Sequence, residues 1–209
     1  MTIWRLRLFL NFDKEESWLN QMAAEGRLLS KACVLYTFSA LAPGSAAVVR
    51  VDYRSSMSRL DFADYVNLFE DSGWRHLHGS RHGGPQYFAS FSADANTDIF
   101  SDANSRAQRY RRSIAAYGVL LPSFLVTVLA GWNPEYWFSP PRDWYFTPGL
   151  WDKHGADFIG AFLFESILVL PRVGAPFLFA AFCLYLLAVI VYQYTLFRKA
   201  RISETPSSM

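Results

Sequence analysis

The chain has 209 residues, of which 52% are hydrophobic and 18% are charged, and its formal net charge is only +2. The part before Ser113 holds fourteen Lys and Arg residues against twelve acidic residues, so it lacks the strongly basic balance of a nucleic-acid-binding domain. The two cysteines, Cys33 and Cys183, are too few for a disulfide framework or a thiolate metal site. We therefore expect no nucleic-acid partner and no cysteine-based centre.

The chain begins with a pattern typical of a strand, a helix and further extended structure. Ile3–Asn11 alternates apolar and other residues, which favours a strand with one buried face. An acid-rich first turn follows Asp13, apolar residues then recur at helical spacing, and Gly26 comes where a helix ends. Leu28–Phe38 is rich in residues that favour strands. The first predicted unit is therefore βαβ with a second strand after a break.

The same order recurs after a loop. Val48–Arg54 predicts a strand, Ser58 begins a helix that Gly73 ends, and Gln86–Phe91 is the last strand. Residues 1–97 are therefore expected to form a cytoplasmic α+β domain of two βαββ units. We expect one mostly antiparallel sheet with both helices on one side, in a ferredoxin-like sandwich.

Six motifs, in order, carry a resemblance to a known family: NFDKEESWLNQMAAEGRLL, YTF, VDYR, LFEDSGW, QYF and IFSDANSRAQRYRR. Together they resemble the domain of unknown function 2812 family of bacteria, over roughly Trp4 to Arg112. Arg27 departs from the family pattern, which usually has an aromatic residue there. Members commonly carry C-terminal membrane helices, and their genes often neighbour PadR-type transcriptional regulators. The resemblance implies a bacterial membrane protein with a regulatory connection, and it implies no catalytic residues.

Three histidines form the one cluster with spacing typical of a metal site: His76, His78 and His82. Residues i and i+2 on a strand share a face, the following turn could bring the third nearby, and imidazoles bind zinc. The surrounding sequence HGSRHGGP is polar and more typical of an exposed turn, so we expect no metal site there. No nucleotide-binding loop, zinc-protease motif or nucleophile elbow is present, so we expect neither a cofactor nor enzymatic activity.

Residues 98–112 predict a basic juxtamembrane helix. Arg106, Arg109, Arg111 and Arg112 are expected to face anionic lipid headgroups. Such a helix acts either as an anchor alone or as a lever that transmits binding. The pattern does not choose between the two.

The second half of the chain predicts two membrane spans. Residues 113–132 and 173–197 are apolar stretches of about 20 residues or more, long enough for a hydrocarbon layer of roughly 30 Å. Between them, 133–172 is expected to be an extracytoplasmic aromatic loop with a short interfacial helix over 156–170. The tail 198–209 carries Arg198, Lys199 and Arg201, so the positive-inside rule places the domain and the C-terminus in the cytoplasm. The family resemblance implies that the membrane is a bacterial inner membrane.

Asp157 and Glu165 are charged residues at helical spacing in an otherwise apolar segment. Such residues mark ion or proton sites when they lie inside the bilayer, although an interfacial helix would let them reach water. The favoured hypothesis is a non-enzymatic membrane-anchored protein whose cytoplasmic domain binds an unknown protein partner. The alternative is an accessory subunit of a membrane transporter or channel.

Overall fold

The structure of the protein is a computed structural model that describes residues 2–42, 44–92, 99–100, 103–131, 133, 135 and 138–202. Contact clustering divides the chain into two compact units. Unit 1 comprises residues 1–116 and 189–209, and unit 2 comprises residues 117–188. The expected end of the domain at 93–98, the Trp132 end of the first span and the tail from 203 lie outside the described residues.

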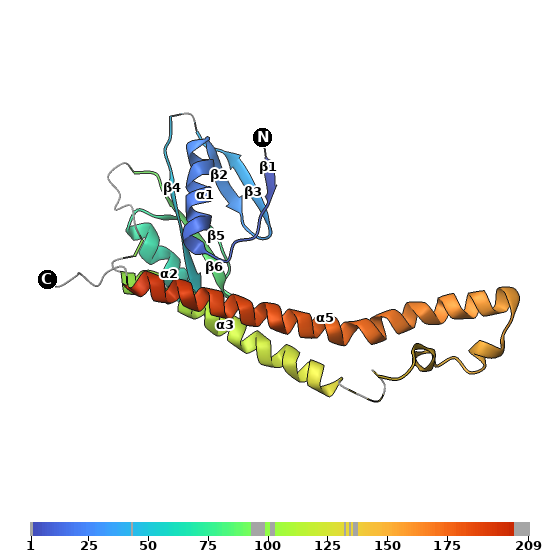
Figure 1. Ribbon diagram of the computed structural model, residues 1–209. Coiled ribbons are helices and arrows are strands. Elements are labelled where there is room, and N and C mark those ends of the chain that lie inside the picture. The colour runs from blue at the N-terminus through green and yellow to red at the C-terminus, as the bar shows by residue number, and fades with distance from the viewer. Residues whose placement is uncertain are drawn as a thin grey trace. The chain divides into compact units, whose positions relative to one another are not determined.

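The two predicted βαββ units are present in unit 1. Their elements are β1 (Ile3–Leu6), α1 (Phe12–Ala24), β2 (Arg27–Lys31), β3 (Leu35–Ala40), β4 (Val48–Arg54), α2 (Arg59–Asp71), β5 (Arg75–His78) and β6 (Gly84–Ser90) (Figure 1). The side chain of Asn11 caps α1 by accepting from the Asp13 and Lys14 backbone N–H groups. Gly26 and Gly73 follow the two helices with positive φ, which a glycine adopts without strain.

The strands form two three-stranded antiparallel sheets rather than the expected single sheet. Their orders are β1-β3-β2 and β4-β6-β5, so each unit places its last strand in the middle. Each strand pairing among the described residues joins two strands of the same βαββ unit: the last strand of each unit pairs with the other two strands of that unit. The repeated order supports the internal duplication, and the two sheets correct the single-sheet prediction.

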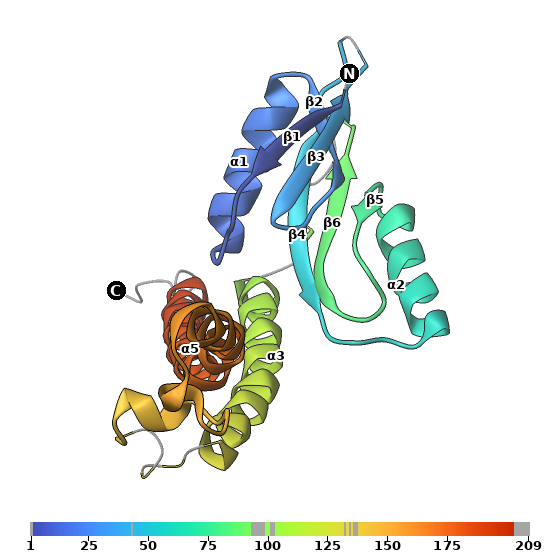
Figure 2. The ribbon, with the colours of Figure 1, turned by 90° about the vertical axis from the view of Figure 1, so that its right-hand side faces the viewer.

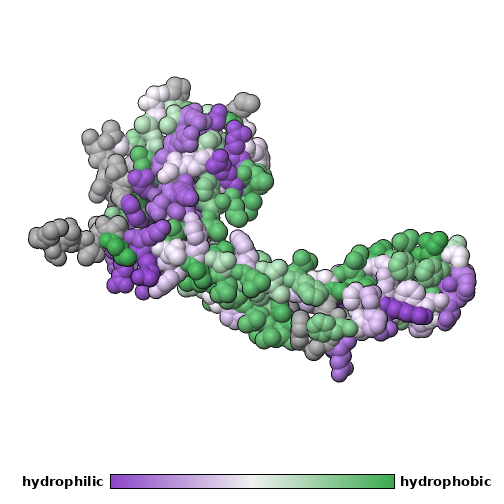
Figure 3. Space-filling view, in the orientation of Figure 1, coloured by the Kyte–Doolittle hydropathy of each residue, from purple (hydrophilic) through white to green (hydrophobic). Residues whose placement is uncertain are grey.

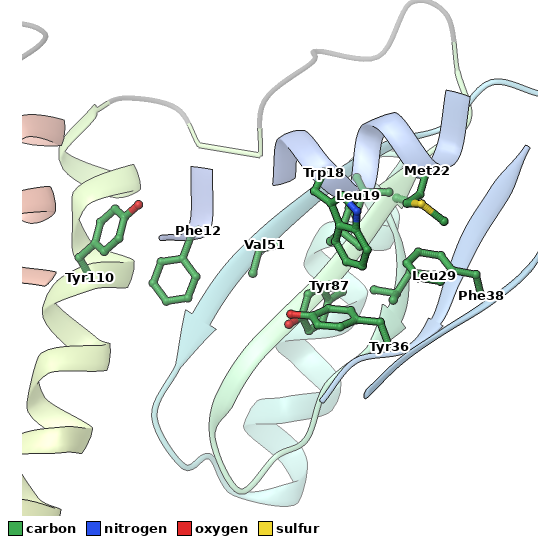
Figure 4. Packing of buried hydrophobic residues seen from close by; sticks show 12 residues of the cluster. Phe12, Trp18, Leu19, Met22, Leu29, Tyr36, Phe38, Val51, Tyr87 and Tyr110 are labelled. Atoms are coloured by element: carbon green, nitrogen blue, oxygen red, sulfur yellow. The ribbon is translucent and has the colours of Figure 1, made fainter. Parts of the chain in front are cut away.

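The helices α1 and α2 lie on opposite sides of β4 and β6 (Figure 2). On β6, Tyr87 joins the core that α1 covers, whereas its neighbour Phe88 packs with Tyr65 of α2. Successive side chains of a strand point to opposite faces, so the second sheet is buried on both. This corrects the expectation that both helices share one side. The main core also includes Trp18, Leu19, Met22, Tyr36, Phe38, Val51 and Tyr110 (Figure 4).

Two long helices follow the domain, α3 (Ala103–Ala130) and α5 (Gly155–Ile202). Both are long and apolar enough to cross a membrane, and hydrophobic side chains cover much of their visible surface (Figure 3). In unit 2, the ring of Phe124 on α3 lies 4.7 Å from that of Phe182 on α5. Two short 3₁₀ helices, η1 (Pro141–Trp144) and η2 (Leu150–Asp152), precede α5.

The helix α5 corrects one predicted boundary. A separate short helix over 156–170 was expected, but α5 continues through Pro171 and Pro176 to Ile202. Proline removes one helix hydrogen bond, yet an apolar helix tolerates it where neighbouring groups satisfy the freed carbonyl. Its 48 residues correspond to a length of about 72 Å, which exceeds twice the hydrocarbon thickness of a bilayer.

Candidate functional site at the junction of the domain and the long helices

Arg109 of α3 is completely buried in unit 1 and carries the junction. Its guanidinium donates to Glu16 Oε1 at 2.5 Å, to Asp13 Oδ1 at 2.6 Å and to the backbone oxygen of Val51 at 2.8 Å. Glu16 Oε1 also accepts from the backbone N–H of Val51 at 2.9 Å. A buried charge is stable only when it is paired and hydrogen-bonded, and this one joins α3 to both α1 and β4.

Aromatic side chains surround the same guanidinium. The carbon Cζ of Arg109 lies 5.4 Å from the ring centre of Phe12 and 5.4 Å from that of Tyr110. Figure 4 shows Phe12 and Tyr110 side by side between the start of α1 and α3. The hydroxyl of Tyr110 donates to Asp13 Oδ2 at 2.7 Å. The first turn of α1 is therefore held against α3 by charge, hydrogen bonds and ring packing together.

Arg112, one turn later on α3, makes a second attachment. It donates to Asp52 Oδ1 at 3.1 Å and to the backbone oxygen of Tyr53 at 3.0 Å. Asp52 is buried, and it also accepts from Arg54 Nε at 2.8 Å and from the hydroxyl of Tyr65 at 3.0 Å. This carboxylate connects α3, β4 and α2.

The structure corrects the membrane-surface expectation for two of the four juxtamembrane arginines. Arg109 and Arg112 point into the domain, because buried acids there need partners. Arg111 is exposed and Arg106 is half-buried, so their contact with lipid headgroups stays a prediction. The three-residue spacing of Arg106, Arg109 and Arg112 fits a protein-facing stripe as well as a lipid-facing one, and no sequence pattern indicates the buried acceptors.

Glu15 is a second buried acid that sequence reasoning missed. Its Oε1 accepts from the hydroxyls of Tyr36 and Tyr87, each at 2.6 Å. Burial raises the pKa of Glu15, and the two tyrosine hydrogen bonds oppose that rise. Glu15 and Glu16 were interpreted only as part of an acid-rich first turn that complements the helix dipole, a pattern that does not indicate burial.

The three histidines do not form a shared cluster. A bulge between His76 and His78 shifts the register, so that His76 pairs with Phe88 and His78 with Tyr87, on opposite faces of the sheet. The ring of His76 lies between Phe62 and Phe88, and burial lowers its pKa. His82 lies exposed in the following turn. Among the residues that the structure describes, no group of three His, Cys, Asp or Glu side chains could hold a metal ion.

The last turns of α5 also attach to the domain in unit 1. Gln193 Nε2 donates to the backbone oxygen of Leu10 at 3.2 Å, and Leu196 and Phe197 pack against the main core. The basic side chains Arg198, Lys199 and Arg201 are exposed there. Their expected contact with lipid headgroups stays a prediction.

In unit 2, the two acids of the candidate intramembrane site, Asp157 and Glu165, have different surroundings. Glu165 accepts from the backbone N–H of Phe146 at 3.2 Å and from the Thr147 hydroxyl at 2.6 Å, and it lies 3.6 Å from Arg172. Asp157 is exposed in the first turn of α5. Glu165 therefore fixes the segment before α5 onto that helix, which is a structural role.

Comparison with known proteins supports the family resemblance. Residues 11–121 match a family described as "Protein of unknown function (DUF2812)". The comparisons with curated proteins and with solved structures gave no significant match. The match spans the whole junction between α1 and α3, and it extends over more than half of the chain. The chain therefore belongs to the DUF2812 family of proteins of unknown function.

Proposed function

We propose that this protein is a non-enzymatic membrane-anchored adaptor. Its α+β domain binds a protein partner in the cytoplasm, and α3 and α5 form a hairpin that crosses the bacterial inner membrane twice. The connection to PadR-type regulators that the family resemblance implies makes a regulatory role the favoured setting. The single observation that carries the proposal is the buried Arg109 network, which attaches an apolar helix of membrane-spanning length directly to the domain.

The Arg109 network argues for a lever rather than a loose anchor. A flexible tether needs no buried charge, whereas here α3 supplies a buried arginine and a buried tyrosine to the domain. Desolvating such groups is costly, and the cost is recovered only in the attached geometry. Partner binding that shifts α1 or β4 would therefore be transmitted to the first turns of α3.

The outer face of α2 is the proposed partner surface. Only Tyr65 of this helix is buried, and Leu60 and Leu68 are 77% and 64% exposed, eight residues apart on one face. The neighbouring charges are mainly acidic, with Asp61, Asp64, Glu70 and Asp71 against Arg59. Two exposed leucines with Asp64 between them on the same face fit an amphipathic helix that carries basic residues.

Cross-linking of the tagged full chain in native membranes tests this proposal. We compare wild type with a Leu60→Ser/Leu68→Ser variant, and Asn67→Ser on the same helix is the matched control. The expected result is one specific cross-linked protein that is retained by the control and lost with the double substitution. Equal recovery from all three chains, or none from wild type, contradicts partner binding through α2.

A further inference from the structure

One face of the first sheet carries large apolar side chains without a partner. Trp4, Leu6 and Leu8 are 59%, 74% and 65% exposed, and Val34 and Leu35 at the start of β3 are 50% and 42% exposed. Trp4 pairs with Thr37 and Leu6 with Leu35, so Trp4, Leu6 and Leu35 share the face away from the core residues Tyr36 and Phe38. Leu8 and Val34 lie just beyond the ends of the two strands. Figure 3 shows hydrophobic surface where β1 and β3 lie in Figure 1. We call Trp4, Leu6, Leu8, Val34 and Leu35 the β1 patch.

A backbone hydrogen bond joins the two ends of the patch that lie nearest the turn between β2 and β3. The backbone N–H of Arg7 donates to the oxygen of Val34 at 3.0 Å, which joins β1 to the turn between β2 and β3. β1 is also an edge strand, since it pairs with β3 alone in its sheet. An exposed apolar edge is normally covered or charged, and here Arg5 and Arg7 alternate with the apolar residues.

The β1 patch is continuous with the apolar surface of α5 inside unit 1. A pocket of about 390 Å³ is lined by Leu8, Phe9, Leu10, Asn11, Lys14 and Tyr192. Tyr192 belongs to the uncharged stretch that ends at Phe197, about 8 Å along the helix from its last residue. Gln193, the next residue, holds Leu10. Because the domain holds Gln193, Leu196 and Phe197, α5 would leave the hydrocarbon before these residues, and Leu8 lies beside Tyr192 next to that point.

The charges around the patch complement an anionic surface. Arg198 and Lys199 are exposed on the last turns of α5, and Lys14 lines the pocket beside Leu8. Arg5 and Arg7 alternate with the patch residues along the strand, and the guanidinium of Arg7 lies 5.1 Å from the ring centre of Trp18 on the core side. Cations mixed with Trp and Leu are the composition of surfaces that lie in the headgroup region of a membrane. The backbone groups at the free edge of β1 would stay hydrated at that depth, as a sheet edge requires.

We infer that the β1 patch is a membrane-docking surface that inserts into the anionic headgroup layer of the same bilayer that α5 crosses. This inference rests on the proposed membrane anchoring. It adds a second contact between domain and lipid, beside the arginines of α3. Docking at β1 would hold the domain flat against the leaflet, with the α2 surface on the other side of the second sheet.

The chain supplies its own reporter for this contact. Cys33 is exposed in the turn beside Val34, and Cys183 is the only other cysteine. A Cys183→Ser chain carries one thiol at the patch. Moving it to Ser45→Cys, with Cys33→Ser, gives a matched exposed turn beyond the other end of β3, roughly 20 Å away. Moving it to Leu184→Cys gives a reporter of the α5 span, because Leu184 is exposed on α5.

The three full-length chains are labelled with one fluorophore and reconstituted in vesicles of phosphatidylcholine and phosphatidylglycerol. Lipids with a nitroxide near the headgroup quench labels in the headgroup layer, and lipids with a nitroxide on the acyl chain quench labels at the depth of Leu184. We expect a loss of fluorescence at Cys33 and at Leu184→Cys, and an unchanged signal at Ser45→Cys. Leu6→Asn/Leu8→Asn should abolish the loss at Cys33 and leave that at Leu184→Cys, since both leucines lie outside the core.

The other outcomes separate a failure of membrane docking at β1 from a failure of membrane anchoring. Quenching at Leu184→Cys without quenching at Cys33 overturns the docking inference and leaves membrane anchoring intact. Absence of quenching at both positions overturns the anchoring and the inference together. Equal quenching at Cys33 and Ser45→Cys shows non-specific adhesion. A change in the fluorescence of the Cys33 label that appears only at high protein density, and not in nanodiscs with one copy, assigns the patch to a second chain. That outcome overturns lipid docking.

Discussion

At the scale of the residue, Arg109 is the side chain on which the junction depends. Removing one member of a buried ion pair leaves the other charge desolvated and unpaired, at a cost of about 3–5 kcal/mol. Arg109→Ala should therefore lower the free energy of unfolding of the domain by that amount, because Glu16 loses its cation. The measurement is a urea titration of the full chain in detergent micelles. Arg111→Ala, an exposed arginine two positions later, is the control and should change stability by less than about 0.5 kcal/mol.

Equal effects of the two substitutions would contradict a buried charge at 109. A double substitution sharpens the result. Replacing both Glu16 and Arg109 by apolar residues of similar size leaves no unpaired charge, although the backbone N–H and C=O of Val51 lose these partners. Glu16→Leu/Arg109→Met should therefore be less destabilised than Arg109→Ala. A double variant that is worse than the single one would show that the pair itself stabilises the junction.

The raised pKa of Glu15 predicts a pH dependence with a defined sign. Above pH 4.5 the unfolded carboxyl ionises while the buried one keeps its proton, so the folded state binds more protons and loses stability as the pH rises. Glu15→Gln cannot ionise. Between the unfolded and folded pKa values, the wild type should lose about 1.4 kcal/mol per pH unit relative to this variant.

Urea titrations of both chains at a series of pH values measure that difference. Glu25→Gln on the exposed end of α1 is the control, and it should follow the wild type closely. A constant difference between wild type and Glu15→Gln across the range would show that Glu15 ionises as it does in water.

At the scale of the element, residue periodicity predicted the helices correctly, whereas it did not predict which strands pair. The helices around Trp18 and Tyr65, with their closing glycines, follow from 3.6-residue spacing, a local property. The division into two sheets depends on which strands pair, and alternation does not encode that. The bulge after His76 breaks the two-residue rule on which the histidine hypothesis depended. Arg109 was placed at the lipid because its acceptors, Glu16 and Val51, lie far away in the sequence.

The segment before α5 is an element whose attachment is testable. Glu165 and Arg172 hold residues 144–147, since Arg172 also lies 4.4 Å from the ring of Phe146. Glu165→Leu should raise amide hydrogen exchange in that segment, and Glu165→Gln should raise it less because an amide oxygen still accepts. Asp157→Asn is the control and should leave exchange unchanged. A loss of ion flux with Glu165→Gln, without a change in exchange, would instead favour the transporter alternative.

At the scale of the whole molecule, one chain contains a part suited to water and a part suited to lipid. Unit 1 buries its acids and aromatic residues around the junction, whereas α3 and α5 expose apolar side chains that water does not tolerate in such number. The two properties meet at Arg109, Arg112 and Gln193, where side chains of the long helices become part of the domain core. The family match includes Arg109 and Arg112 and ends at residue 121, so it does not include Gln193 or the rest of the second half.

The charge distribution predicts the topology, although Arg109 and Arg112 now count toward the domain rather than the lipid surface. Arg106 and Arg111 precede the first span and Arg198, Lys199 and Arg201 follow the second, whereas the intervening residues 133–172 hold Arg142, Lys153 and Arg172 beside five acids. The positive-inside rule therefore still places both termini in the cytoplasm. Green fluorescent protein fused after Met209 should fluoresce, and alkaline phosphatase inserted after Lys153 should be active. The same reporters at Met1 are the control and should match the C-terminal result. An active phosphatase after Met209 would require an odd number of crossings, and it would show that α5 crosses the bilayer in a different way from the proposed hairpin.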